Sequence, residues 1–431
     1  MNRNQIIIFG AIGLIVIGLI FAFIFGRKST QTTQAEGDIL MWGVFDDSDV
    51  IADFISKFNE SYPRIKITYQ KKSVDSYESD LIDALAGGKG PDIFYFQNTW
   101  LPKHINKLTP MPAAYMTAND FKDIFVDVAS EDFVSDNNIY AVPLYIDTLA
   151  LFYNKDIFNT VGIANPPSTW EGLLSMVPSL TQKDGAGNIT RSAIAIGTAR
   201  NVNRATDILS LLMLQSGTQM SDKQTGKALF NMDTYTDTTK YPSGQQSLEF
   251  YTNFSNPRKQ VYTWNNQLGY SIDSFLEGKT AMMINYSYQM QNILAKAPHL
   301  RFGISLMPQP RGSQQAVNYS NYWGLAVSRT SSASDVAWGF VNYLTQKDQA
   351  QNYLKLTNKP TAHRDLIDSQ RQESKEMAIF AQQTLSAYTW IRPDSNAVEK
   401  IFESMIESTV SGVPSKSALD QAANNFDLLI R

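Results

Sequence analysis

Polar side chains that can bind hydroxyl groups stand directly after two segments that are predicted to be buried strands. They are Asp46 and Asp47 after the segment 38–44, and Gln97, Asn98 and the neighbouring Trp100 after the segment 93–96. The carboxyl ends of parallel strands open onto a shared crevice, where α/β proteins bind ligands. A ligand contact is therefore one interpretation. For Asp46 and Asp47 the other is a role at the N-terminus of the following helix.

The composition excludes several kinds of chemistry. The 431 residues contain no Cys and three widely separated His, which excludes thiol catalysis, disulfides and Cys-based zinc sites and disfavours a His-based metal site. The 41 acidic and 37 basic residues give a net charge of −4, which provides no positive field for nucleic acid. We therefore expect no metal and no nucleic-acid partner.

The N-terminal segment indicates attachment to a membrane. Ile6 to Phe25 is a run of 20 residues without a charged or polar side chain. As a helix it would span about 30 Å, the thickness of a bilayer core. A cleaved signal peptide is the alternative, but its apolar core normally has about 7 to 15 residues and precedes a small-residue cleavage motif. We predict an anchor over 1–28, with a transmembrane helix at 6–25, and a tether over 29–37.

From residue 38 onward the pattern is α/β. Apolar runs at 38–44, 65–69 and 93–96 predict strands, and helical spacing predicts helices from 50 and over 77–86 between them. This alternation predicts a parallel sheet covered by helices. Further strands are expected at 140–146, 149–153, 192–196 and 281–285, and further helices at 205–215, 335–344 and over the last eighty residues.

Two further features bear on the organisation of the chain. Its length is two to three times that of an ordinary domain, which predicts at least two lobes. Ser168 followed by Glu171 predicts a capping box at the start of a helix. The prediction of two lobes bears on the location of the site, because ligands commonly bind where two lobes meet.

A set of segments after the tether occurs in the order and spacing of a known protein family. The segments are FNESYPRIKI (58–67), LIDALAGGKGPDIF (81–94), YAVPLYIDTLALFYNKDIF (140–158), PPSTWE (166–171), FLEGKTAMMINYSY (275–288), WGLAVS (323–328), AWGFVNYL (337–344) and the C-terminal helices with Trp390. In these segments the chain resembles the extracellular solute-binding proteins of ABC importers, in the subgroup that includes maltose- and oligosaccharide-binding proteins.

This resemblance implies two α/β lobes with a ligand cleft between them, a periplasmic-binding-protein-like fold. The first lobe is expected to hold 38–145 and 324–355, and the second 149–322 and 357–431. The chain would then cross between the lobes near 146–148, near 322–323 and near Leu356. Closure of the lobes around a ligand by hinge motion is known for proteins of this kind.

The resemblance also implies which residues contact the ligand. Tyr145 and Asp147 fall on the first crossing, where the family places an acidic ligand contact, and Tyr286 and Tyr288 follow a strand where it places aromatic rings that stack on sugars. Asp46 and Asp47 stand where polar residues of the family contact sugar hydroxyls. Two more aromatic residues belong either to the cleft or to the core, and they are Trp323 and Trp390.

The resemblance implies a receptor outside the cytoplasm, and the apolar N-terminal segment predicts that it is tethered to the membrane. It would capture a small solute, with a sugar as the expected ligand, and deliver it to the permease subunits of an ABC importer without a cofactor and without being an enzyme. The alternatives are a glycoside hydrolase that uses a pair of carboxyl groups, a sensory receptor, and a binding protein for a metal, polyamine or peptide. No feature of the sequence places two carboxyl groups face to face.

Overall fold

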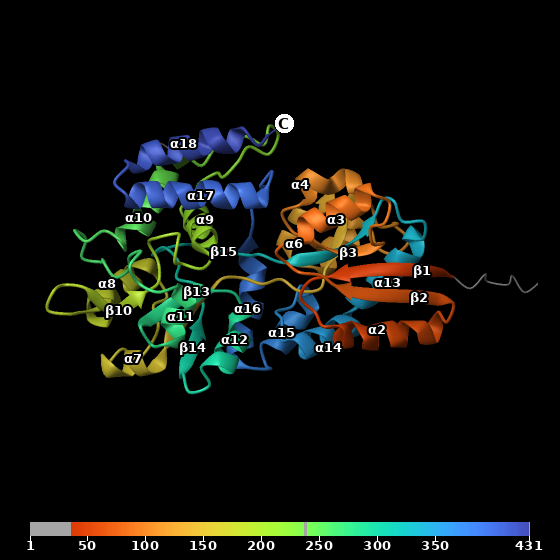
Figure 1. Cartoon of the computed structure of the whole chain (residues 1–431), viewed down its shortest axis with the longest axis horizontal. Coiled ribbons are helices and arrows are strands. Elements are labelled where there is room, and N and C mark those ends of the chain that lie inside the picture. Colours follow the sequence, from red (N-terminus) through yellow and green to blue (C-terminus); the bar gives the residue numbers. More distant parts are fainter. Residues whose placement is uncertain (1–35, 237–238, 431) are drawn as a thin grey trace, which may run out of the picture.

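The chain folds into two α/β lobes that lie side by side (Figure 1). The computed structural model describes residues 36–236 and 239–430. The transmembrane helix predicted at 6–25 and most of the tether at 29–37 lie outside these ranges. Among the helices within them, none combines the length and the apolar character that a bilayer crossing requires.

The first lobe is built on a mixed sheet with the strand order β2-β1-β3-β16-β4, and β7 pairs with β16. Its strands are β1 (Gly37–Gly43), β2 (Ile65–Lys71), β3 (Ile93–Gln97), β4 (Leu108–Thr109), β7 (Ala141–Pro143) and β16 (Trp323–Ser328). β1 runs parallel to β2 and to β3, whereas β16 runs antiparallel to β3. The predicted parallel sheet is therefore present for the first three strands only, because β16 returns from the second lobe and enters in the opposite direction.

The helices of the first lobe follow from the spacing of their apolar residues. In α2, Ile51, Phe54 and Phe58 recur at helical spacing on one face, and all three are buried. The helix ends two residues before Pro63, which cannot continue it. The lobe contains α2 (Ser48–Ser61), α3 (Tyr77–Ala86), α4 (Leu101–His104), α5 (Ala118–Ile124), α6 (Asp127–Phe133), α13 (Ser334–Thr345), α14 (Lys347–Thr357) and α15 (Ile367–Gln370).

The second lobe has a sheet with the strand order β14-β8-β13-β10-β9. Its strands are β8 (Ala150–Asn154), β9 (Gln182–Lys183), β10 (Ile189–Ile194), β13 (Thr280–Asn285) and β14 (Phe302–Ser305). β13 lies inside this sheet, and every one of its residues is buried. A run without polar alternation is typical of a strand covered on both faces.

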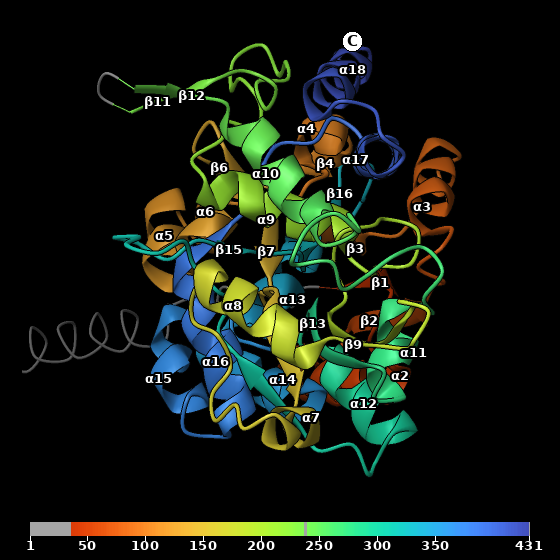
Figure 2. The ribbon, with the colours of Figure 1, turned by 90° about the vertical axis from the view of Figure 1, so that its left-hand side faces the viewer.

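The helices of the second lobe come from two separate stretches of the chain. They are α7 (Lys155–Thr160), α8 (Trp170–Leu180), α9 (Ala205–Gln215), α10 (Ser243–Asn253), α11 (Ser271–Leu276), α12 (Gln289–Lys296), α16 (Lys375–Gln383), α17 (Ser395–Val410) and α18 (Ser415–Asp427). The hairpin of β11 (Thr234–Thr236) and β12 (Thr239–Tyr241) projects from this lobe (Figure 2). α17 and α18 lie across the lobe, and the start of α17 faces the first lobe (Figure 1).

The start of α8 differs from the sequence prediction by one residue. Ser168 was expected to cap this helix together with Glu171, but Thr169 occupies the N-cap position. The hydroxyl of Thr169 accepts the backbone N–H of Gly172 at 3.1 Å. The shift has a packing reason, because Trp170 must begin the helix for its ring to enter the core of the lobe, where it is 4% exposed.

The chain changes from one hydrophobic core to the other at short crossings. Ile146 packs in the core of the first lobe and Leu149 in that of the second. Tyr319 packs in the second core and Tyr322, three residues later, in the first. These changes define the two connections that flank the space between the lobes.

The third crossing lies further along the chain than the sequence suggested. Leu356 is inside α14, whose residues Tyr353 and Leu354 pack in the first core. Ile367 in α15 still belongs to that core, whereas Met377 in α16 packs on the second sheet. We therefore place the third crossing between α15 and α16, and we propose 38–146 with 322–370, and 149–319 with 375–430, as the two lobes.

Candidate functional site

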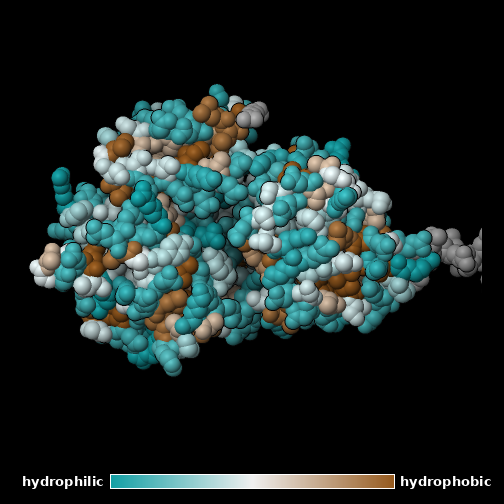
Figure 3. Space-filling model, in the orientation of Figure 1, coloured by the Kyte–Doolittle hydropathy of each residue, from teal (hydrophilic) through white to brown (hydrophobic). Residues whose placement is uncertain are grey.

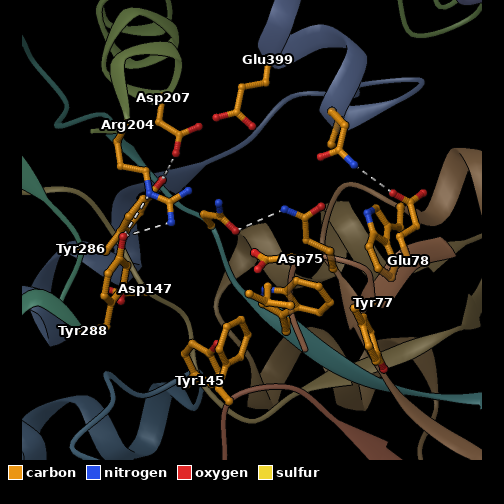
Figure 4. A pocket seen from close by; sticks show the side chains of 18 of the residues that line it. Asp75, Tyr77, Glu78, Tyr145, Asp147, Arg204, Asp207, Tyr286, Tyr288 and Glu399 are labelled. Atoms are coloured by element: carbon orange, nitrogen blue, oxygen red, sulfur yellow. Dashed lines mark hydrogen bonds between the residues drawn. The ribbon is translucent and has the colours of Figure 1, made fainter. Parts of the chain in front are cut away.

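A cavity of about 1100 Å³ lies between the two lobes. It is visible as a hollow at the middle of the molecule in Figure 3, and Figure 4 shows the side chains that line it. Both lobes contribute to its wall. Seven residues predicted from the sequence line it, and they are Gln97, Trp100, Tyr145, Asp147, Tyr286, Tyr288 and Trp323.

Aromatic rings form the wall that the first lobe contributes. The ring of Trp323, at the start of β16, lies 5.1 Å from that of Trp100, 5.5 Å from Phe45 and 5.7 Å from Tyr77, each in an edge-on arrangement. Tyr77 and Trp100 are buried behind it, whereas Phe45 is 41% exposed. Because edge-on packing fixes the orientation of rings, Trp323 and Phe45 present an apolar surface of fixed orientation to the cavity.

Gln97 adds hydrogen-bonding groups beside this aromatic wall. Its Nε2 donates to Oδ1 of Asn321 at 3.4 Å, and its Oε1 accepts the hydroxyl of Thr99 at 3.0 Å. Asn321 stands on the second crossing. A hydrogen bond at this length is weak, so the amide of Gln97 can exchange this partner for a ligand.

Asp147 fixes the first crossing against the second lobe. Its Oδ1 accepts the backbone N–H of Ser287 at 3.0 Å, and its Oδ2 accepts the hydroxyl of the same residue at 2.7 Å. Burial raises the pKa of Asp147 to about 6, and the hydrogen bonds from Ser287 act against this rise. Its carboxylate is thus largely engaged within the protein, and the side chain lines the cavity as an organised part of the hinge region.

Two tyrosines and an arginine form the wall that the second lobe contributes. The rings of Tyr286 and Tyr288 stack with their centroids 6.3 Å apart. Tyr286 is buried and its hydroxyl donates to Asp207 at 2.9 Å, whereas Tyr288 is 46% exposed. Nε and Nη2 of Arg204 donate to the hydroxyl of Tyr288 at 3.2 and 3.0 Å. Of the two rings, Tyr288 is therefore the one available for stacking on a ligand.

Two further charged residues complete this end of the cavity. Arg392 is buried, and its Nη1 lies 4.0 Å from Oδ1 of Asp207. Glu399 on α17 points its carboxyl group toward Asp207 (Figure 4). Burial, followed by the negative charge of Asp207, raises the pKa of Glu399.

Polar contacts join the lobes at one edge of the cavity. Nζ of Lys103 in α4 lies 2.8 Å from Glu78 in α3 and 2.6 Å from Asp394, the N-cap residue of α17. The hydroxyls of Thr99 and Ser395 lie 2.5 Å apart. These contacts link the first lobe to the start of α17 across the opening of the cavity.

The structure does not bring Asp46 to the cavity surface as a ligand contact. Its carboxylate is buried, accepts the hydroxyl of Tyr353 at 2.8 Å and that of Tyr95, and pairs with Nζ of Lys359 at 2.7 Å. Lys359 itself lines the cavity and lies 4.4 Å from the ring centroid of Tyr145. Asp46 therefore positions a lysine of the wall, because three internal partners leave its carboxylate little capacity for a ligand.

Three more predicted contacts lie elsewhere. Asp47 is exposed and pairs with Lys71 at 2.6 Å; it occupies the N-cap position of α2 without a side-chain capping bond. Asn98 is buried and donates to Asp132 at 2.9 Å. Trp390 packs in the second core, where it is 7% exposed. Other side chains of the protein thus enclose Asn98 and Trp390, and neither lines the cavity.

Sequence reasoning missed several charged residues of the wall. They are Glu78, Lys103, Arg204, Asp207, Lys359, Arg392 and Glu399. Lys359 and Arg392 each precede a Pro, which disfavours helix and places a long cationic side chain on an extended segment. No comparable local signal marks Arg204 or Asp207. Within the described ranges, the structure has no cluster of three or more metal-ligating side chains.

The sequence matches a family model over most of its length. The model described as bacterial extracellular solute-binding protein matches residues 46–351. A protein of Brucella abortus (strain 2308), named only as a binding protein, is 22% identical over 344 residues, which are 78% of this chain and 77% of the relative. The maltotriose-binding protein of Pyrococcus abyssi (strain GE5 / Orsay) is 22% identical over 333 residues, 75% of this chain and 67% of the relative.

Solved structures show the same fold. The cyclic alpha-maltosyl-1,6-maltose binding protein from Arthrobacter globiformis superimposes with a TM-score of 0.75 at 18% sequence identity. The match covers 92% of this chain and 99% of that protein. At this identity the likeness concerns the fold alone, and it confirms the two-lobed architecture that the sequence predicted.

Proposed function

This chain belongs to the bacterial extracellular solute-binding proteins, as its sequence predicted, and on this basis we propose that it captures a sugar between its lobes and delivers it to the permease subunits of an ABC importer. The proposal gives the protein no catalytic role of its own. It assigns the cavity of about 1100 Å³ as the place where the sugar binds.

The observation that carries the proposal is that aromatic rings and hydrogen-bonding groups line the same cavity. The first lobe contributes the rings of Trp323, which is partly buried, and of the exposed Phe45, with Gln97 beside them, and the second lobe contributes Tyr288 with charged groups around it. A sugar ring has an apolar face and a belt of hydroxyls, which need these two kinds of surface. The similarity to the maltotriose-binding protein of Pyrococcus abyssi and to the cyclic alpha-maltosyl-1,6-maltose binding protein of Arthrobacter globiformis supports the same ligand class.

A thermal-shift screen followed by calorimetric titration tests the ligand class. A ligand that binds only the folded protein raises its melting temperature by mass action. We expect sugars, and not amino acids, polyamines or metal ions, to stabilise the protein in such a panel. Stabilisation by amino acids, polyamines or metal ions alone would contradict the proposal.

A hydrolase on the same fold is the competing function. Asp207 and Glu399 face each other across one end of the cavity (Figure 4). However, Asp207 already accepts the hydroxyl of Tyr286 and faces Arg392, so it is held in place by internal partners. A glycosidase needs one carboxyl group free to transfer a proton and another free to attack or to activate water. We expect oligosaccharides to be recovered uncleaved after long incubation with the protein, as measured by mass spectrometry.

We also propose that residues 6–25 anchor the chain in the membrane with the two lobes outside the cytoplasm. The support is the 20-residue apolar run and the family's extracellular role. The full chain should stay with membranes during alkaline extraction, and a chain starting at Gly37 should be released. A mature protein from the native host that begins between residues 29 and 37 would show that the segment is cleaved instead.

A further inference from the structure

One end of the cavity carries a buried guanidinium group with too few hydrogen-bond acceptors. Arg392, on the extended segment before α17, is 6% exposed and lines the cavity. Its Nε has no hydrogen-bond partner among the residues that the structure describes. Its Nη1 lies 4.0 Å from Asp207, beyond hydrogen-bond distance. A guanidinium has five N–H donors, and a buried donor without a partner costs free energy. The protein therefore leaves the guanidinium of Arg392 short of acceptors, which a ligand could supply.

A second guanidinium group lies at the same end. Arg204 precedes α9 in a left-handed backbone conformation with φ 64°, which is unfavourable for a side chain of this kind. Its guanidinium lies 5.4 and 5.7 Å from the ring centroids of Tyr286 and Tyr288 and donates to the hydroxyl of Tyr288. Stacking and hydrogen bonding together hold this cation in a fixed place.

Two acidic groups lie near the two arginines. Asp207 on α9 faces Arg392 and accepts the hydroxyl of Tyr286. Glu399 on α17 is the other; burial and then the charge of Asp207 raise its pKa, whereas the charges of Arg204 and Arg392 lower it. Neither group supplies an acceptor to Nε of Arg392. A ligand with a carboxylate would bring such an acceptor.

We infer that this end of the cavity binds the carboxylate of an acidic sugar, a uronic acid, with Arg392 and Arg204 as its charged partners. The inference rests on the proposed sugar-binding function and specifies its ligand class. A carboxylate fits the planar fork of a guanidinium with two parallel hydrogen bonds. The hydroxyl of a neutral sugar accepts one hydrogen bond at a time and does not match this fork.

Calorimetric titration of the full chain in detergent tests the inference. The ligands are galacturonate and glucuronate, as monomers and oligomers, each compared with its neutral parent sugar and with its methyl ester, which removes the charge alone. We expect the uronates to bind at least tenfold more tightly than the other two forms. Arg392→Gln should weaken uronate binding tenfold or more and change binding of the neutral parent less than threefold.

Control variants separate charge from folding. Arg301→Gln removes an exposed arginine that pairs with Asp156 outside the cavity, and it should leave all affinities unchanged. Should Arg392→Gln fail to fold, Arg204→Gln tests the second cation. Because Arg204 also contacts the ring of Tyr288, this variant should weaken binding of the neutral parent as well, but binding of the uronate more.

Three outcomes would overturn the inference, and they differ in what else they affect. Equal affinity for uronates and neutral sugars, with Arg392→Gln changing both alike, would contradict the acidic ligand class. It would leave the proposed sugar-binding function in place. Tighter binding of a sugar phosphate than of a uronate would also contradict the inference, because the anionic group of the ligand would then be a phosphate. No binding of any sugar in the panel would contradict the proposed function itself.

Discussion

Tyr288 is the most exposed of the aromatic side chains that line the cavity, at 46%. Its ring is supported from behind by Tyr286, with the centroids 6.3 Å apart, so it is oriented before any ligand arrives. Truncation of such an aromatic anchor typically costs about 2 kcal/mol or more in binding free energy. We expect Tyr288→Ala to weaken sugar binding at least tenfold, about 1.4 kcal/mol, in a calorimetric titration.

The matched control for this variant is Tyr235→Ala. Tyr235 is 70% exposed on the β11–β12 hairpin, away from the cavity, and its loss should leave the affinity unchanged. Tyr288→Phe keeps the ring and removes the hydroxyl that accepts from Arg204, so it should bind more tightly than Tyr288→Ala. Native affinity of Tyr288→Ala would show that the ring does not contact the ligand.

The carboxyl group of Asp147 makes the stability of the protein depend on pH. Burial raises its pKa to about 6 in the folded state, whereas an unfolded Asp titrates near about 4. The folded protein therefore holds the proton over this range while the unfolded chain releases it. The resulting stabilisation is complete below about pH 4 and is lost as the pH rises through about 6; two pKa units correspond to roughly 3 kcal/mol at most.

Asp147→Asn should remove this dependence. We expect the free energy of unfolding of the native protein to fall, relative to that of the variant, as the pH rises from 4 to 7 in urea titrations. Asp132, whose pKa burial also raises to about 6, contributes equally to both curves and cancels. Asp47→Asn, at an exposed ion pair, is the control and should follow the native curve. Parallel curves for Asp147→Asn and the native protein would contradict the assignment.

Individual residues of the site were predictable only where a strand end or a family motif marked them. Tyr288 and Asp147 carry such marks, and both line the cavity. Asp46 carries the same mark, yet it pairs with Lys359, which is 313 positions away in the sequence. Arg204 was hidden for a similar reason, because it contacts Tyr288, which is 84 positions away in the sequence. Contacts at this separation leave no local pattern.

At the level of elements, apolar spacing predicted where helices and strands form better than how they pair. The strand predicted at 281–285 corresponds to β13, and the helix predicted at 77–86 corresponds to α3. The antiparallel direction of β16 was not predictable from its own residues. Strand direction depends on the side from which the chain enters the sheet, and the chain reaches β16 through a crossing from the other lobe.

The start of α8 provides a test of capping. The hydroxyl of Thr169 accepts the N–H of Gly172 at 3.1 Å, and the side chain of the preceding Ser168 is exposed. Loss of a capping hydroxyl typically costs about 1 kcal/mol of stability. We expect Thr169→Ala to lower the free energy of unfolding by about this amount in urea titrations, and Ser168→Ala to change it by less than about 0.5 kcal/mol. The reverse ranking would return the cap to Ser168.

At the scale of the whole molecule, the two-lobed architecture was predicted from length and from the family resemblance together. Length alone predicts more than one lobe, but it does not say where the chain crosses. The sequence placed the third crossing near Leu356, which is too early, because α14 and α15 continue to pack on the first lobe. Apolar spacing in the sequence indicates the buried face of a helix, but it does not show on which of the two lobes that face packs.

The lobes also touch away from the crossings, and this contact bears on closure around a ligand. Lys103 of the first lobe lies 2.6 Å from Asp394 at the start of α17, and the hydroxyls of Thr99 and Ser395 lie 2.5 Å apart. These bonds exist only while the lobes are close together, so they favour the closed arrangement over an open one. A ligand that contacts both walls shifts the same equilibrium in the same direction.

Lys103→Ala should therefore shift the protein toward an open arrangement. Its ion pair with Asp394 is about one-third exposed, so its loss should cost no more than about 1 kcal/mol, which is at most about a fivefold loss of sugar affinity. In small-angle scattering we expect a larger radius of gyration for the ligand-free variant than for the native protein, and equal values at saturating sugar. Lys57→Ala, which removes an exposed pair within α2, is the control and should change neither quantity. Identical ligand-free profiles and affinities for Lys103→Ala and the native protein would show that this contact does not hold the lobes together.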